Sequence, residues 1–139
     1  MENKILEILI DEARQAFEED EVPVGCVIIK NSQILSTSHN TKMQNKCVIN
    51  HAEINAIITA SKIIGDWRLD ECTLYVTLEP CSMCKEAIRQ ARIRKVYYLL
   101  PSEFHNEDNK EINYTLIDQN NEIQKDYKLL LQQFFSNKR

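Results

Sequence analysis

The sequence predicts a three-layer α/β sandwich built around a mixed, five-stranded sheet. Segments rich in β-branched residues alternate along the chain with segments whose apolar residues recur at helical spacing. The chain has 139 residues, of which 43% are hydrophobic and only two are glycine. A chain of this length can bury a core without disulfide staples. We therefore expect residues 1–139 to form a single domain.

The first half is predicted to contain a helix, two strands, a polar loop and a second helix, at residues 3–19, 22–30, 34–37, 38–50 and 51–64. In the first helix, Ile5, Leu9 and Ala13 recur at every fourth position, which places them on one face. The first strand is rich in Val and Ile, and Gly25 within it predicts a close backbone approach or a bulge. Gly65 follows the second helix and is expected to end it.

The second half is predicted to contain three strands, two helices and a polar loop, at residues 73–78, 82–92, 95–100, 101–110, 112–117 and 122–135. Pro80 suits the start of the helix at 82–92, because a proline near the first helical position loses no needed hydrogen bond. In the last helix, Ile123, Tyr127 and Phe134 fall along one side. Strands interleaved with helices in this order predict a mixed sheet between helical layers.

Charge and cysteine content restrict the compartment and the partners. The net charge of −4 gives no support for nucleic-acid binding. Five basic residues nevertheless form a cluster that is either an RNA-binding surface or a solvated helix face: Lys85, Arg89, Arg92, Arg94 and Lys95. The odd count of five cysteines and the absence of an export signal predict a reducing, cytoplasmic location. No apolar run approaches about 18 residues, so we expect no membrane partner.

A pair of cysteines at the start of a predicted helix indicates a metal site. Cys81 and Cys84 lie three residues apart, on one side of the first helical turn, where the helix N-terminus stabilises thiolates. Zn²⁺ takes four ligands, and a site with three protein ligands and a fourth position for water is typical of catalytic zinc. We expect His51 to be the third protein ligand. A redox dithiol and bound Fe²⁺ are the alternatives.

A second motif supplies a candidate catalytic group. His51-Ala52-Glu53, followed by Pro80-Cys81-x-x-Cys84, is the pattern of zinc-dependent base deaminases. In this pattern Glu53 is a proton shuttle between the attacking water, the ring nitrogen and the departing amine, so that an oxo group replaces an amino group. The structural alternative is a capping box, in which Asn50 caps the helix and Glu53 completes the pair.

Several segments resemble the bacterial tRNA adenosine deaminase (TadA) family of the cytidine/deoxycytidylate deaminase superfamily. The resemblance runs from about residue 5 to residue 100, with a weaker match at residues 133–139. It implies a cytidine deaminase-like fold, a homodimer, one Zn²⁺ per subunit, and conversion of wobble adenosine to inosine in a tRNA anticodon loop. The matching segments are Glu21–Gly25, His51–Ile54, Leu74–Cys84 and Ala91–Ile93.

The resemblance also implies roles for individual residues. Glu53 would be the proton shuttle, and Asn40 would contact a nucleoside flipped into the pocket. Val24 is a further candidate for substrate contact. Phe134 and Phe135 would lie near bound RNA, where stacking on an aromatic ring contributes about 1–3 kcal/mol per base. For Phe134, a core-facing position at the end of a helix is the alternative.

Two segments depart from the family pattern. Residues 47–50, Cys-Val-Ile-Asn, stand where the family usually has Asp-Pro-Thr-Ala, and the loop at 101–110 is shorter and lacks glycine. Both segments would affect substrate choice and neither touches the zinc chemistry. A deaminase of a free nucleobase or nucleoside, of guanine or cytosine type, is therefore an alternative, as is a zinc-stabilised interaction module without catalysis. The place of Cys47 before His51 suggests that its thiol lies at the pocket rim.

Overall fold

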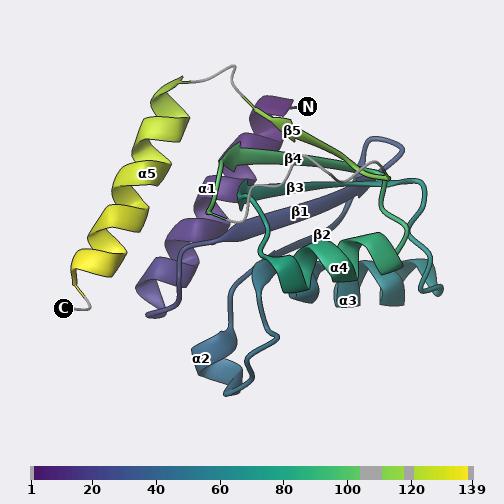
Figure 1. The fold of residues 1–139 in the computed structure, drawn as a ribbon, viewed down its shortest axis with the longest axis horizontal. Coiled ribbons are helices and arrows are strands. Elements are labelled where there is room, and N and C mark those ends of the chain that lie inside the picture. The colour runs from purple at the N-terminus through teal and green to yellow at the C-terminus, as the bar shows by residue number, and fades with distance from the viewer. Residues whose placement is uncertain (1, 104–110, 118–120, 138–139) are drawn as a thin grey trace.

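The structure, a computed structural model, describes residues 2–103, 111–117 and 121–137. Five helices and five strands follow one another within these residues (Figure 1). In chain order they are α1 (Glu2–Glu18), β1 (Gly25–Lys30), β2 (Gln33–His39), α2 (Lys42–Asn45), α3 (Ala52–Ile64), β3 (Cys72–Leu78), α4 (Ser82–Gln90), β4 (Lys95–Leu100), β5 (Asn113–Leu116) and α5 (Asn121–Ser136).

The strands form one mixed sheet in the order β2-β1-β3-β4-β5. Strand β1 runs antiparallel to β2 and to β3, whereas β3, β4 and β5 run parallel. In this register the start of β1, at Gly25, pairs with the end of β2, at His39. The end of β3, at Leu78, pairs with the end of β4, at Leu100. The residues that follow β2, β3 and β4 therefore emerge at one edge of the sheet, beside those that precede β1.

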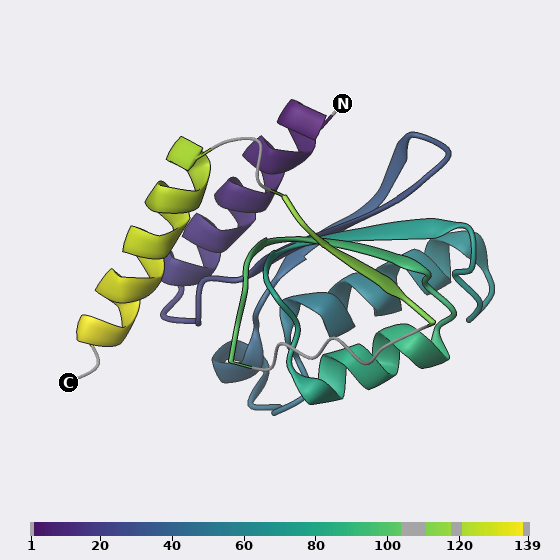
Figure 2. The same cartoon turned by 45° about the horizontal axis from the view of Figure 1, so that its top comes forward.

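Helices cover both faces of the sheet, which confirms the predicted three-layer sandwich. Helices α1 and α5 pack side by side on one face, and α3 and α4 cover the other (Figure 2). Helix α3 carries three fully buried alanines whose small side chains let the helix lie close to the sheet: Ala52, Ala56 and Ala60. No helix within the described residues has the length and apolarity needed to cross a bilayer.

Two contacts hold the segment before β1 in place. A Cβ atom added to Gly25 would lie 2.4 Å from the backbone oxygen of Leu9 on α1, so the predicted close approach is real. The hydroxyl of Tyr127, on α5, donates a 2.8 Å hydrogen bond to the carbonyl of Pro23. Tyr127 is fully buried, so this bond ties the last helix to the edge of the sheet where the strands end.

The structure differs from the predicted elements mainly between residues 20 and 50. Strand β1 begins at Gly25 and not at Val22, because the Val24 amide turns back to the Val22 carbonyl (2.8 Å). The predicted polar loop contains the short helix α2. Strand β2 extends to His39, whose ring nitrogens contact Glu12 (3.3 Å) and Glu19 (3.0 Å) beside α1. These side-chain contacts between distant segments have no signal in the local sequence.

Candidate metal centre and active-site pocket

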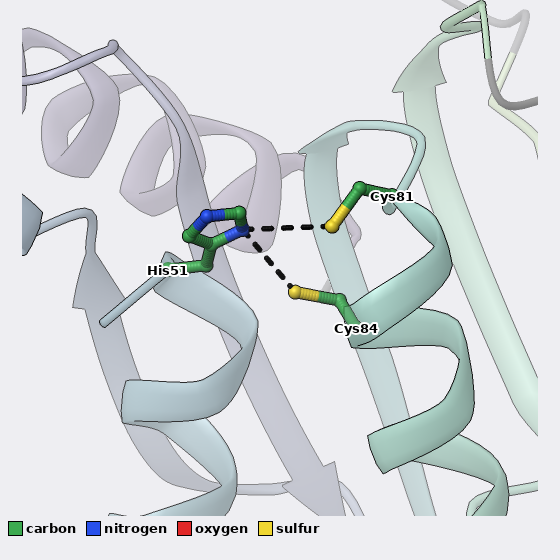
Figure 3. A group of neighbouring side chains, drawn as sticks. All are labelled: His51, Cys81 and Cys84. Atoms are coloured by element: carbon green, nitrogen blue, oxygen red, sulfur yellow. Dashed lines mark hydrogen bonds between the residues drawn. The ribbon is translucent and has the colours of Figure 1, made fainter. Parts of the chain in front are cut away.

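The starts of two helices bring the three predicted metal ligands together. His51 is the N-cap residue of α3 and Cys81 is the N-cap residue of α4, both with extended backbone. Cys84 lies one turn further along α4 and is fully buried. The Nδ1 atom of His51 lies 3.6 Å from the Sγ atom of Cys81 and 3.4 Å from that of Cys84 (Figure 3).

This arrangement fits a tetrahedral zinc site. Zinc bonds of about 2.3 Å to sulfur and 2.0–2.1 Å to nitrogen place the two atom types about 3.5–3.6 Å apart. The observed separations agree with that spacing, and the three donor atoms all lie within 4.8 Å of one another. A histidine and two cysteines also form the donor set that zinc prefers, with room for one further ligand. The residues present therefore fit one Zn²⁺ ion.

The two thiols differ in their electrostatics. Hydrogen bonds from Cys84 and from His51 lower the pKa of Cys81 to about 3. The pKa of Cys84 is raised, because its hydrogen bond to Cys81 and its burial both favour the neutral thiol. In the metal-free protein these contacts favour a thiolate at Cys81 and a neutral thiol at Cys84, whereas the predicted influence of the helix N-terminus stays a prediction. A bound cation would displace the proton that the pair holds, so zinc affinity depends on pH.

Glu53 lies in the first turn of α3 and is 4% exposed. Burial raises the pKa of its carboxyl from 4.5 to about 7. The capping-box interpretation is wrong, since His51 and not Asn50 is the N-cap residue and makes no side-chain cap. The Asn50 amide instead donates to the side chain of Asn55 (2.8 Å). Glu53 is thus a buried carboxyl group two residues from the candidate ligand His51, and its pKa lies close to neutral pH.

Asn40 supplies the contact expected from a capping residue. Its Oδ1 atom accepts a 2.6 Å hydrogen bond from the Ala52 amide, the first in α3. The side chain is buried and lines the same cavity as His51 and Glu53. With Oδ1 engaged by the helix, the amide nitrogen is the group that remains to meet a ligand.

A cavity of about 820 Å³ opens over these residues. Its floor contains His51, Glu53 and Cys81. Its walls come from the edge of the sheet where the strands end, and from α5. The four predicted substrate-contacting residues all line it: Val24, Asn40, Phe134 and Phe135. Their shared location agrees with a binding role, which stays a prediction.

The two phenylalanines differ in exposure. Phe134 is 7% exposed, and its ring meets Phe17 of α1 edge to face, with 6.3 Å between the ring centroids. Phe135 is 54% exposed and lies at the cavity wall. Phe134 is therefore also a packing residue, as the alternative interpretation proposed. Phe135 is the more exposed of the two rings.

Two buried carboxylates near the cavity were not among the predicted site residues. Glu21 is 1% exposed, and its carboxylate accepts hydrogen bonds from the Met43 (2.9 Å) and Gln44 (2.8 Å) amides at the start of α2. Glu79 is 2% exposed and lines the cavity. Glu79 follows an apolar strand and precedes the Pro80-Cys81 motif, which was the available signal for it, whereas Glu21 ends an acidic run that hides it in the sequence. Glu21 thus fixes α2 against the pocket wall.

One expectation about the residues near the pocket is not met. The described residues that line the cavity do not include Cys47, so its thiol is not at the rim. The basic cluster is divided. Lys85 contacts Glu79 beside the metal centre, whereas the three arginines of the cluster line a separate hollow of about 530 Å³: Arg89, Arg92 and Arg94. Lys85 and the three arginines therefore lie in different environments, and an RNA-binding role of the cluster stays a prediction.

Comparison with known proteins agrees with this geometry. Residues 1–100 match the family described as the cytidine and deoxycytidylate deaminase zinc-binding region. The tRNA-specific adenosine deaminase of Bacillus subtilis (strain 168) is 45% identical over 89 residues, which are 64% of this chain and 55% of that protein. That of Agrobacterium fabrum is 45% identical over 93 residues, 67% of this chain and 61% of that protein. The matched part thus spans little more than half the length of these relatives.

Solved structures give the same relationship. A structure from work on A-to-I editing by tRNA:A34 deaminases at the wobble position is 34% identical, covers 84% of this chain and 98% of its own, and has a TM-score of 0.77. Guanine deaminase from Nitrosomonas europaea has a TM-score of 0.79 over 94% of this chain and 82% of its own, at 17% identity, which shows the shared fold alone. With its match over residues 1–100, the chain belongs to the cytidine and deoxycytidylate deaminase zinc-binding family.

Proposed function

We propose that this chain is a zinc-dependent hydrolytic deaminase that converts wobble adenosine to inosine in a tRNA anticodon loop. The observation that carries the proposal is the buried Glu53 carboxylate, which shares the floor of one cavity with His51 and Cys81. Relatives at 44–45% identity that carry the name tRNA-specific adenosine deaminase support the choice of substrate.

The proposed reaction adds water to the amidine carbon of the base and releases ammonia. His51, Cys81 and Cys84 would hold a zinc ion, which supplies Lewis acidity that lowers the pKa of a water molecule toward neutrality. Glu53 takes the proton from the attacking water and delivers protons to the ring nitrogen and the departing amine. A carboxyl whose pKa is about 7 can both accept and release a proton at neutral pH.

The walls of the cavity supply candidates for base recognition. The Asn40 amide nitrogen can donate a hydrogen bond to an acceptor on the base while Oδ1 stays bound to α3. Val24 offers an apolar surface beside it, and Phe135 an exposed ring at the wall. Enzymes that act on a base take it out of the stack and into such a pocket.

Deamination of a free nucleobase or nucleoside is the second candidate. Five carboxylates line the described part of the cavity (Asp20, Glu21, Glu53, Glu79 and Glu103), whereas Lys42 is the one lysine or arginine among the described lining residues. Phosphate groups bind less readily at an acidic rim, so this charge balance favours an uncharged ligand.

Inosine formation separates the two candidates. The substrates are an anticodon stem-loop with adenosine at the wobble position, guanine and cytosine, and zinc content is measured on the same sample. Inosine at the wobble position alone supports the tRNA assignment. A folded, zinc-loaded protein that deaminates only free bases favours the second candidate.

We further propose a single deaminase domain over residues 1–139 and a homodimer. The described strands form one sheet, and the hydrophobic cores on its two faces include residues of α1, α3, α4 and α5, which supports the first. Helices α2 and α3 expose large apolar side chains, which supports the second: Met43 (63%), Ile58 (44%) and Ile63 (59%). Sedimentation of the wild type and of an Ile63→Lys variant tests the dimer. The cytoplasmic location stays a prediction.

A further inference from the structure

Lys85 turns its ammonium group toward a buried carboxylate beside the metal centre. It follows Cys84 on α4, and its side chain is 14% exposed. The Nζ atom lies 3.3 Å from Oε2 of Glu79 and 5.3 Å from the centroid of the Tyr114 ring on β5. A lysine held in this way is poorly placed to neutralise a phosphate in solvent, although its sequence position put it in the basic cluster.

Glu79 connects this lysine to the pocket wall. Its side chain is 1% exposed, and its Oε1 atom accepts a 3.2 Å hydrogen bond from the Ser102 amide. Its own amide donates to the Leu100 carbonyl (2.9 Å). The carboxylate therefore joins α4, which carries the cysteines, to the segment that follows β4.

That segment forms one wall of the cavity. Leu100, Pro101, Ser102 and Glu103 all line it, together with Glu79. No strand or helix holds residues 101–103, so their placement depends on contacts such as the bond between Ser102 and Glu79. The ammonium group of Lys85 offsets part of the hydration that the Glu79 carboxylate loses on burial, so the ion pair supports this bond.

We propose that Lys85 is a positioning residue: through its ion pair with Glu79 it holds residues 100–103 as the pocket wall and so sets the fit of the substrate. The predicted effect on substrate binding rests on the proposed function, whereas the predicted effect on the Ser102 amide does not. Lys85 is therefore distinguished from a residue that contacts RNA directly, because its loss changes the wall and leaves the phosphate contacts intact.

The test compares Lys85→Met, Lys85→Arg and the matched control Lys95→Met, an exposed lysine at the start of β4. In Lys85→Met we expect the Ser102 amide to exchange hydrogen at least about tenfold faster, since a bond to a charged acceptor is lost. KM for the anticodon stem-loop should rise about tenfold while kcat changes little and zinc content stays at one per chain. Lys85→Arg should restore both values, and Lys95→Met should leave both unchanged.

Two results would overturn the proposal. One is a hydrogen-exchange rate of the Ser102 amide in Lys85→Met that stays within about twofold of the wild-type rate. The other is a fall of about one in the salt slope of RNA binding, which marks a lost phosphate contact. If Lys85→Met does not fold, Glu79→Gln tests the same link, because it keeps the side-chain shape and removes the charge. Faster Ser102 exchange without any deaminase activity would support the wall and count against the proposed function alone.

Discussion

Replacing Glu53 with Gln removes the proposed proton shuttle at almost constant volume. A positioned acid or base contributes about 10²–10⁴-fold to a rate. We therefore expect kcat for inosine formation to fall at least about 100-fold, which corresponds to about 3 kcal/mol of activation free energy. Zinc content should stay at one per chain, because His51, Cys81 and Cys84 keep their geometry. Glu53→Ala should likewise keep its zinc and lose activity.

The same substitution should stabilise the zinc-free protein above neutral pH. Burial raises the pKa of Glu53 from 4.5 to about 7, so the folded protein holds this proton to a higher pH than the unfolded chain does. The free energy of unfolding therefore falls as pH rises from about 4.5 to 7, by about 3 kcal/mol in total. Glutamine does not ionise, so its burial causes no such fall in the free energy of unfolding. In urea unfolding of the chelated, reduced protein, Glu53→Gln should exceed the wild type at about pH 8 and equal it at about pH 4.

Two outcomes would refute this reasoning. Near-normal turnover of Glu53→Gln would remove the proton-shuttle role. A stability difference that is the same at both pH values would show that burial does not set the proton affinity of the carboxyl. Glu18→Gln, on an exposed position of α1, is the control and should change neither quantity.

Four further substitutions test other parts of the site and the fold. Cys84→Ala should lose both zinc and activity, because two protein ligands do not hold a catalytic zinc; metal analysis of the purified variant checks this. His39→Gln should destabilise the protein at about pH 6 and not at about pH 9. A hydrogen bond to Glu12, chiefly, raises the pKa of His39 above 6.5, so its ion pairs contribute below pH 6.5 and are lost as pH rises through the folded value; urea midpoints measure this. Phe135→Ala should weaken RNA binding by about 1–3 kcal/mol in a titration. Phe134→Ala should chiefly lower the free energy of unfolding, by about 3–5 kcal/mol.

Local sequence signals predicted most of the fold, because its strands and helices each have their own pattern. The β4 strand has the predicted bounds, 95–100. Gly65 ends α3 with a positive φ of 78°, as its position suggested. The signals fail between residues 20 and 50, where α2 depends on the distant carboxylate of Glu21. A side chain that caps a helix from 22 residues away leaves no trace in local periodicity.

The metal centre could be predicted because ligand spacing is a local property of each helix start. The contacts that position the walls of the cavity could not be predicted. Asn40 was expected to contact substrate, and the structure shows in addition that it caps α3. Lys85 was grouped with three arginines and Lys95 in a cluster that was either an RNA-binding surface or a solvated helix face, and the structure places it against Glu79. In both cases the missing information was which segments meet at the edge of the sheet, and only the register of β1, β2, β3 and β4 provides it.

Three buried glutamates surround the cavity, and their partners separate their roles. Glu21 accepts hydrogen bonds from two amides of α2, and Glu79 accepts from Lys85 and from the Ser102 amide. Carboxyl groups held by such donors fix the segments that they join. For Glu53 burial is the dominant influence, and it raises the pKa to about 7. A carboxyl that exchanges its proton near neutral pH suits proton transfer and is poorly suited to anchoring a loop, so the environment of Glu53 supports the proposed proton-shuttle role.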